Sequence, residues 1–256
     1  MIKFFRKIRQ NMIKENKASK YMLYAIGEIV LVVIGILIAL QINNWSESRK
    51  NSYKEDELKR ALLSDFKETK IRLQETIKRQ QQVIDYSRQL IISYDTKQLM
   101  SIKDSLPLFT GFGFGSWWRA EPVTKTYQSM INTGNINLLS DDILKQKLAE
   151  FHAELDSGFE DQEESMNLLN ALSIQLAPYG FMLKENIARK EIGIPHLNDS
   201  LLKYIVSDKD VMKLQLDHSL FNLAAKRMLL ENNRLKSQRK MEGFVDDILL
   251  ILNKHD

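Results

Sequence analysis

An unbroken apolar run dominates the hydrophobic pattern of the first fifty residues. Residues 21–42 are apolar except for Glu28, Gln41 and the tyrosine hydroxyls. An α-helix rises about 1.5 Å per residue, so this run makes a helix of roughly 33 Å, and the hydrocarbon core of a bilayer is about 30 Å thick. The pattern therefore predicts one transmembrane helix near the start of the chain.

A secretory signal peptide is the main alternative for such a run. Its apolar core spans about 7–15 residues and ends at a cleavage site made of small residues. The run here is longer, and its exit from Gln41 to Trp45 contains no such site. We therefore expect an uncleaved membrane anchor.

Beyond this run the polar and apolar positions follow a helical period. Residues 46–95 contain neither Gly nor Pro, and their apolar positions recur at spacings of three and four. Residues 207–252 favour a second long helix, which only Gly243 interrupts. We predict an all-α fold: a single N-terminal transmembrane helix followed by an extracytoplasmic helical bundle, with the long first and last helices packed antiparallel.

Three local signals mark helix ends between the two long helices. Gly134 is placed to end a helix, because glycine adopts the left-handed conformation of a C-terminal cap. The three residues Ser140-Asp141-Asp142 are placed to start the next helix. Ser207 and Asp210 resemble a capping box, with Asp in place of the usual Glu or Gln.

The positive charge of the chain is concentrated before the anchor. Residues 1–20 hold seven basic residues and one acidic residue, whereas residues 43–256 hold 30 basic and 31 acidic residues. The large domain is therefore almost neutral, which argues against nucleic acid as a partner. Basic residues favour the cytoplasmic side of a span. We predict a cytoplasmic segment at 1–20, a transmembrane helix at 21–42 and a periplasmic domain at 43–256.

The basic segment is also amphipathic. Met1, Phe5, Ile8 and Met12 recur at helical spacing. Such a helix lies in the headgroup plane with its cations near anionic lipid; the alternative is a topology signal that happens to be amphipathic. The residues that we expect at the membrane interface are Lys3, Arg6, Lys7, Arg9 and Trp45.

Glu28 is the one ionisable group inside the predicted span. At about 100° per residue it shares a face with Tyr24, Gly35 and Ala39. Small residues let two helices approach closely, and a polar group can hydrogen-bond across the contact. This face predicts self-association or partner binding. The alternatives are an acid tolerated near the headgroups and a proton or ion relay, although one span with one ionisable group makes no pathway.

A glycine- and aromatic-rich stretch, GFGFGSWWRAEP, interrupts the helical pattern at residues 111–122. Its glycines do not have the spacing of a dinucleotide or P-loop motif, so nucleotide binding is not expected. An extended chain would place Phe112 and Phe114 on one side, with Trp117 and Trp118 directly after them. These four aromatic residues either close one end of the bundle or form a surface for a partner.

No constellation in the sequence indicates catalysis. The four histidines form no H-E-x-x-H motif, and His152 with Asp156 is an i, i+4 pair on one helix without further ligands. His218 falls on an apolar seam and is expected to be a histidine of the bundle interior. We predict no catalytic residues, no metal site and no cofactor. The absence of cysteine leaves the redox compartment open.

The chain also resembles a known group of proteins. The opening IKFFRKIRQN and the stretch LYAIGEIVLVVIGILIALQINNW are similar to the start of a large family of uncharacterised bacterial single-pass membrane proteins. A looser similarity covers TYQSMINTGNINLLSDDILKQKLAEF at residues 126–151. The resemblance implies a bacterial inner-membrane protein with a periplasmic helical domain, and it implies no activity.

Two functional hypotheses remain at this point. The first is a non-enzymatic, membrane-anchored interaction or scaffold protein that contacts lipid and assembles with itself or with another membrane protein. The second is a periplasmic sensor module for a small ligand or for the state of the envelope, acting through a membrane partner. Neither the sequence nor the resemblance identifies a small-molecule ligand.

Overall fold

The computed structural model describes residues 18–157, 162–179 and 206–254, and every regular element within these ranges is a helix. The longest, α2, runs from Ala18 to Asp95 and contains the predicted span. The prediction of an all-helical chain with one long apolar N-terminal helix is confirmed. The chain divides into two compact units, Met1–Glu57 and Leu58–Asp256, with the division inside α2.

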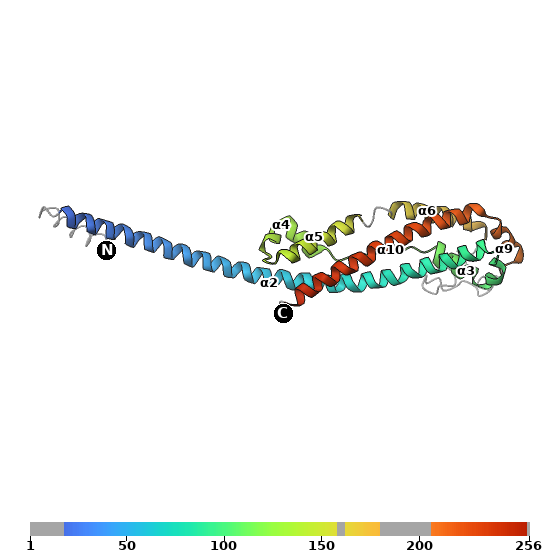
Figure 1. Ribbon diagram of the computed structural model, residues 1–256, viewed down its shortest axis with the longest axis horizontal. Helices are drawn as coiled ribbons and strands as arrows, with labels where there is room; N and C mark the ends of the chain where they lie inside the picture. The colour runs from blue at the N-terminus through green and yellow to red at the C-terminus, as the bar shows by residue number, and fades with distance from the viewer. Residues whose placement is uncertain (1–17, 158–161, 180–205, 255–256) are drawn as a thin grey trace, which may run out of the picture. The chain divides into compact units, whose positions relative to one another are not determined.

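The second unit combines two long helical segments with several short elements (Figure 1). After α2 the chain forms the 3₁₀ segment η1, a single α-helical turn α3 and the π-helical turn η2. Two α-helices joined by a 3₁₀ turn follow, and then α6, which ends in a further 3₁₀ turn. Among the residues that the structure describes, the remaining helices are α9 and α10. Their bounds are η1 Leu99–Ser105, α3 Leu106–Phe109, η2 Thr110–Phe114, α4 Lys125–Thr133, η3 Asn135–Leu138, α5 Asp142–Ser157, α6 Gln162–Leu176, η4 Ala177–Tyr179, α9 Asp208–Gln215 and α10 His218–Asn253.

Side-chain contacts join α10 to the part of α2 that belongs to the second unit. Lys70 Nζ lies 2.8 Å from an Asp246 carboxylate oxygen, and Arg239 donates to the Gln81 side chain at 2.9 Å. At the far end of α2, the Tyr94 hydroxyl contacts His218 Nδ1. The part of α2 in the second unit therefore lies beside α10 (Figure 1).

Two apolar clusters fill the second unit. The first joins α2, just after Leu58, to α4, α5 and the end of α10. In it Phe66 and Phe151 are in edge-to-face contact, with 5.2 Å between ring centroids. The second joins the end of α2 to the short helices η1, α3 and η2, to α6 and α9, and to the start of α10. In it the Tyr94 and Phe221 rings stack at 3.7 Å.

The predicted helix ends at Gly134, at Ser140-Asp141-Asp142 and at Ser207 are confirmed. Gly134 has φ of +71°, the left-handed conformation that favours glycine at a helix C-terminus. Asp141 Oδ1 accepts the backbone N–H of Leu144 at 2.9 Å at the start of α5. Ser207 Oγ accepts the N–H of Asp210 at 3.1 Å and donates to the Asp210 carboxylate at 2.7 Å. The helix α10 continues through Gly243.

Candidate functional site

The apolar part of α2 is the first candidate for function. Its large apolar side chains from Ile26 to Ile42 are between 47% and 73% exposed within the chain. By length and composition this is the one helix among the described residues that is able to cross a membrane, and its apolar window has a mean hydropathy of 2.6. Water is an unfavourable neighbour for so much apolar surface, and lipid is a favourable one.

The predicted association face lies on this segment. Gly35 and Ala39 are exposed and Glu28 is half-buried, while the side chain of Tyr24 lies outside the described residues. A Cβ added at Gly35 would meet no atom within 4 Å. A single chain leaves the Gly35 side of the helix uncovered, so association through this face stays a prediction.

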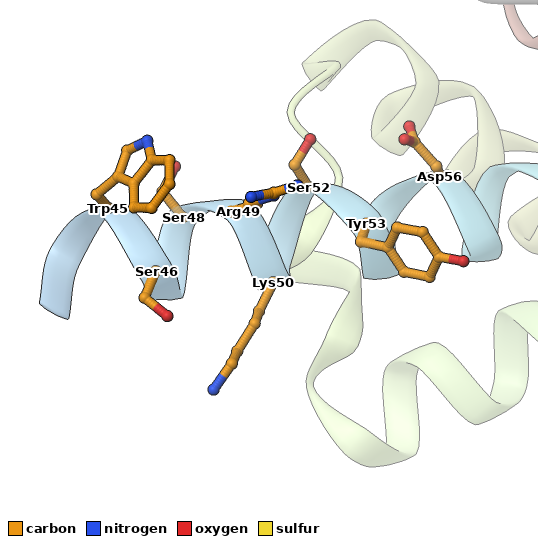
Figure 2. A pocket seen from close by; sticks show the side chains of 8 residues that line it. All are labelled: Trp45, Ser46, Ser48, Arg49, Lys50, Ser52, Tyr53 and Asp56. Atoms are coloured by element: carbon orange, nitrogen blue, oxygen red, sulfur yellow. The ribbon is translucent and has the colours of Figure 1, made fainter. Parts of the chain in front are cut away.

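The predicted interface residues are only partly described. Lys3, Arg6, Lys7 and Arg9 lie outside the described residues. Trp45 is 65% exposed, and the Arg49 guanidinium lies over its ring, 5.8 Å from the centroid. Side chains of α2 from Trp45 to Asp56 surround an open hollow on this helix (Figure 2).

The first part of the aromatic stretch is helical rather than extended, because Thr110–Phe114 forms a π-helical turn, and residues 116–124 belong to no regular element. Phe114 is 1% exposed and packs against Phe221 with 6.1 Å between ring centroids, so it belongs to the bundle interior and not to a partner surface. Phe112, Trp117 and Trp118 are half-buried. The two indoles are covered by cations. Arg234 lies 5.1 Å from the Trp117 centroid, and Arg79 lies 4.2 Å from the Trp118 centroid.

Close packing against α2 explains the glycine at position 113. A Cβ built at Gly113 would lie 2.9 Å from the backbone nitrogen of Ser87 on α2. Real side chains do not approach so closely, so the π-helical turn rests directly on the backbone of α2. Close packing against α2 therefore requires glycine at position 113.

Two arginines of α10 bind the backbone carbonyl groups of the same stretch. Arg227 Nη1 donates to the Gly113 carbonyl at 3.1 Å and also to that of Phe114, and Arg227 Nη2 donates to the Ser116 carbonyl. Arg234 Nη2 donates to the Trp118 carbonyl at 2.7 Å. Both side chains are almost fully buried, and this burial lowers the pKa of Arg227.

Glu231 lies between these arginines and is 2% exposed. Arg234 Nη1 donates to both of its carboxylate oxygens, at 3.0 and 2.9 Å, and Ser165 Oγ donates to it from α6 at 2.5 Å. Gln80 of α2 donates to it as well, and Gln238 donates to Gln80 at 3.2 Å. We call these six side chains the buried polar layer: Gln80, Ser165, Arg227, Glu231, Arg234 and Gln238.

The layer separates the two apolar clusters. Along α10 it occupies the positions between Ala224, in the second cluster, and Met241, in the first. Its charged atoms are directed at one another and at backbone carbonyls, so the arrangement fixes the packing of α2, α6 and α10 around the 113–118 stretch. The layer is not apparent from the sequence alone, although its members on α10 recur at the spacing of three and four that marks the apolar seam.

The histidines do not form a metal centre in the described part of the chain, where no cluster of three or more potential ligands occurs. His152 stacks on Tyr127 at 3.7 Å, and its Nε2 is buried without a hydrogen-bond partner. Burial lowers the pKa of His152 to about 4 despite the opposing effect of Asp156. His218 is exposed at the start of α10, so its expected place in the bundle interior is wrong: Leu220 and Phe221 take the buried positions there.

The sequence was compared with known protein families, curated proteins and solved structures. The profile of the family of unknown function DUF6090 matches residues 28–177, more than half of the chain. The chain belongs to this family. The match covers α2 from Glu28 onward and continues through α6 into η4, whereas α9 and α10 lie beyond it. The comparisons with curated proteins and with solved structures give no match.

The buried polar layer makes a testable contribution to stability. Glu231→Gln keeps the shape of the side chain but leaves the charges of Arg227 and Arg234 without an anion. We expect the free energy of unfolding to fall by about 3–5 kcal/mol, because an uncompensated buried charge is strongly destabilising. Urea unfolding of the full chain in detergent, followed by circular dichroism, measures this. Glu164→Gln, which removes an exposed pair with Lys226, is the control and changes stability by less than about 1 kcal/mol. Equal losses in both variants would contradict the assigned role.

The lowered pKa of His152 predicts a loss of stability in acid. The unfolded chain binds a proton at this histidine near pH 6.5 and the folded chain only near pH 4, so stability is complete above pH 6.5 and falls as the pH drops between these values. Unfolding measured across this range shows a shallower decline for His152→Phe, which retains an aromatic ring against Tyr127. His218→Gln, at an exposed site, keeps the decline of the parent. A His152→Phe profile parallel to that of the parent argues against the burial effect.

Proposed function

We propose that the protein is a single-pass protein of the bacterial inner membrane that carries a helical interaction module on the periplasmic side. In this proposal the N-terminus is cytoplasmic, the extracytoplasmic bundle is built on antiparallel packing of α2 and α10, and the protein has no enzymatic activity. The observation that carries the proposal is the exposure of the apolar side chains from Ile26 to Ile42. The excess of basic residues before this segment supports the orientation.

The interior of the second unit supports a structural rather than a catalytic role. The guanidinium Nη groups of Arg227 and Arg234 and the Glu231 carboxylate bind one another and backbone carbonyls, so these groups serve to hold the helices together. We therefore place the interacting surfaces on the span and on the outside of the bundle. Assembly with a second copy, or with another membrane protein, follows from the face formed by Tyr24, Glu28, Gly35 and Ala39.

The orientation is tested with single cysteines, because the chain has none of its own. A membrane-impermeant maleimide added to intact spheroplasts is expected to label Ser101→Cys, at an exposed position of η1. The same reagent is expected to label Lys7→Cys only after lysis. Labelling of Lys7→Cys in intact spheroplasts, with Ser101→Cys protected until lysis, would reverse the proposed topology.

The association face is tested by crosslinking in native membranes. Glu28→Leu removes the polar group and Gly35→Leu adds bulk on the same face, so each is expected to lower association by about threefold or more, given the energies of polar and packing contacts between membrane helices. Val30→Leu adds bulk on the opposite face and is expected to leave the crosslinked fraction unchanged. If Glu28→Leu and Gly35→Leu crosslink as the parent does, this face has no part in assembly.

A further inference from the structure

The segment of α2 just beyond the apolar run combines aromatic and cationic side chains on one face. At about 100° per residue, Trp45, Arg49, Ser52 and Asp56 fall within about 40° of one stripe. In Figure 2, Trp45 and Ser52 lie on the same side of the helix, whereas Lys50 points to the opposite side. On this stripe Arg49 therefore lies between the Trp45 ring and the Ser52 hydroxyl.

The Arg49 side chain reaches back toward the apolar run. Its guanidinium carbon lies 5.8 Å from the centroid of the Trp45 ring, which is one helical turn closer to the span. Helical side chains tilt toward the N-terminus, so this direction is the one that the backbone favours. Both side chains are exposed, and this leaves the N–H groups of the guanidinium accessible from outside the helix.

The depth of these groups follows from helix geometry if the apolar run spans the membrane, as the proposed function requires. Trp45 lies three residues past Ile42, or about 4.5 Å further along the helix axis. The headgroup layer extends about 5–7 Å beyond the hydrocarbon on each side. The Trp45 ring and the Arg49 guanidinium above it are thus at the level of the lipid phosphates.

We propose that Arg49, over the Trp45 ring, binds the phosphate of an anionic glycerophospholipid at the extracytoplasmic surface of the membrane. A guanidinium presents a planar fork of N–H donors that matches two phosphate oxygens, and an indole is favourable at the headgroup level. The Ser52 hydroxyl on the same stripe is a further donor. Asp56, which would repel an anion, lies nearly two helical turns beyond Arg49, further from the span.

This lipid site is separate from the cationic segment at residues 1–20. In the proposed topology those residues face the other leaflet, so they contribute nothing to lipid selection around Trp45. The site therefore adds a contact between Arg49 and the extracytoplasmic leaflet that does not involve residues 1–20.

The test uses fluorescence quenching of Trp45 by acyl-brominated lipids in vesicles of phosphatidylcholine. The full-length protein is reconstituted, and the emission of Trp45 is taken as the difference between the parent and Trp45→Phe. Brominated phosphatidylglycerol is expected to quench this emission more strongly than brominated phosphatidylcholine at the same mole fraction. Arg49→Gln is expected to lower this preference by about fivefold, the effect of one cation near a charged surface.

Two further variants sharpen the result. Arg60→Gln makes the same change in charge at an exposed position eleven residues further along the chain, and it is expected to keep the preference of the parent. Arg49→Lys keeps the charge but loses the planar pair of guanidinium donors, and it is expected to retain part of the preference for phosphatidylglycerol. High salt is expected to weaken the preference, since screening acts on exposed charges.

The outcomes separate this inference from the proposed function. If neither brominated lipid quenches Trp45, the segment is not at a membrane and the proposed function fails. If both lipids quench Trp45 equally in the parent, or if Arg49→Gln keeps the preference for phosphatidylglycerol, the anchor stands and the lipid site is wrong.

Discussion

The packing of the second unit depends on one buried carboxylate. An ionised group inside a protein is tolerated only when charges and hydrogen bonds compensate for the water that it loses. Glu231 receives hydrogen bonds from Arg234, Ser165 and Gln80, which come from α10, α6 and α2. The same requirement applies to the arginines, whose Nη groups also donate hydrogen bonds to backbone carbonyls of the 113–118 stretch. Three helices and one irregular segment are thereby held in a single register.

The apolar clusters on either side of this layer have a different character. Apolar contacts are non-directional, so Leu, Ile and Phe side chains accept small shifts of one helix along another. The polar layer does not accept such shifts, because each displaced donor would leave an unpaired group in the interior. We attribute the cohesion of the bundle to the clusters and its specific alignment to the layer. Polar residues in the interior of coiled coils fix register in the same way.

Much of the architecture could be predicted from the sequence because its signals are local. The long helix through residue 95, the glycine that ends α4 and the serine that starts α9 each depend on neighbours within a few residues. The buried polar layer could not be predicted in this way. Arg227, Glu231 and Arg234 look like solvated charges in the sequence, and their burial depends on partners more than 60 residues away. The place of Phe114 could not be predicted for the same reason, since its burial depends on Phe221 of α10, which is distant in the sequence.

The family match has a boundary with a physical consequence. The carbonyls at 113–118, the Ser165 hydroxyl and the Gln80 amide all lie within residues 28–177, whereas the two guanidinium groups and the carboxylate that they bind lie beyond it. A polypeptide truncated at the end of the matched region would keep the carbonyls, the hydroxyl and the amide but would lack the charged groups that bind them. The carbonyl oxygens of its π-helical turn would then need water or another cation as a hydrogen-bond partner. The region that the family profile matches therefore depends on α10 for its packing.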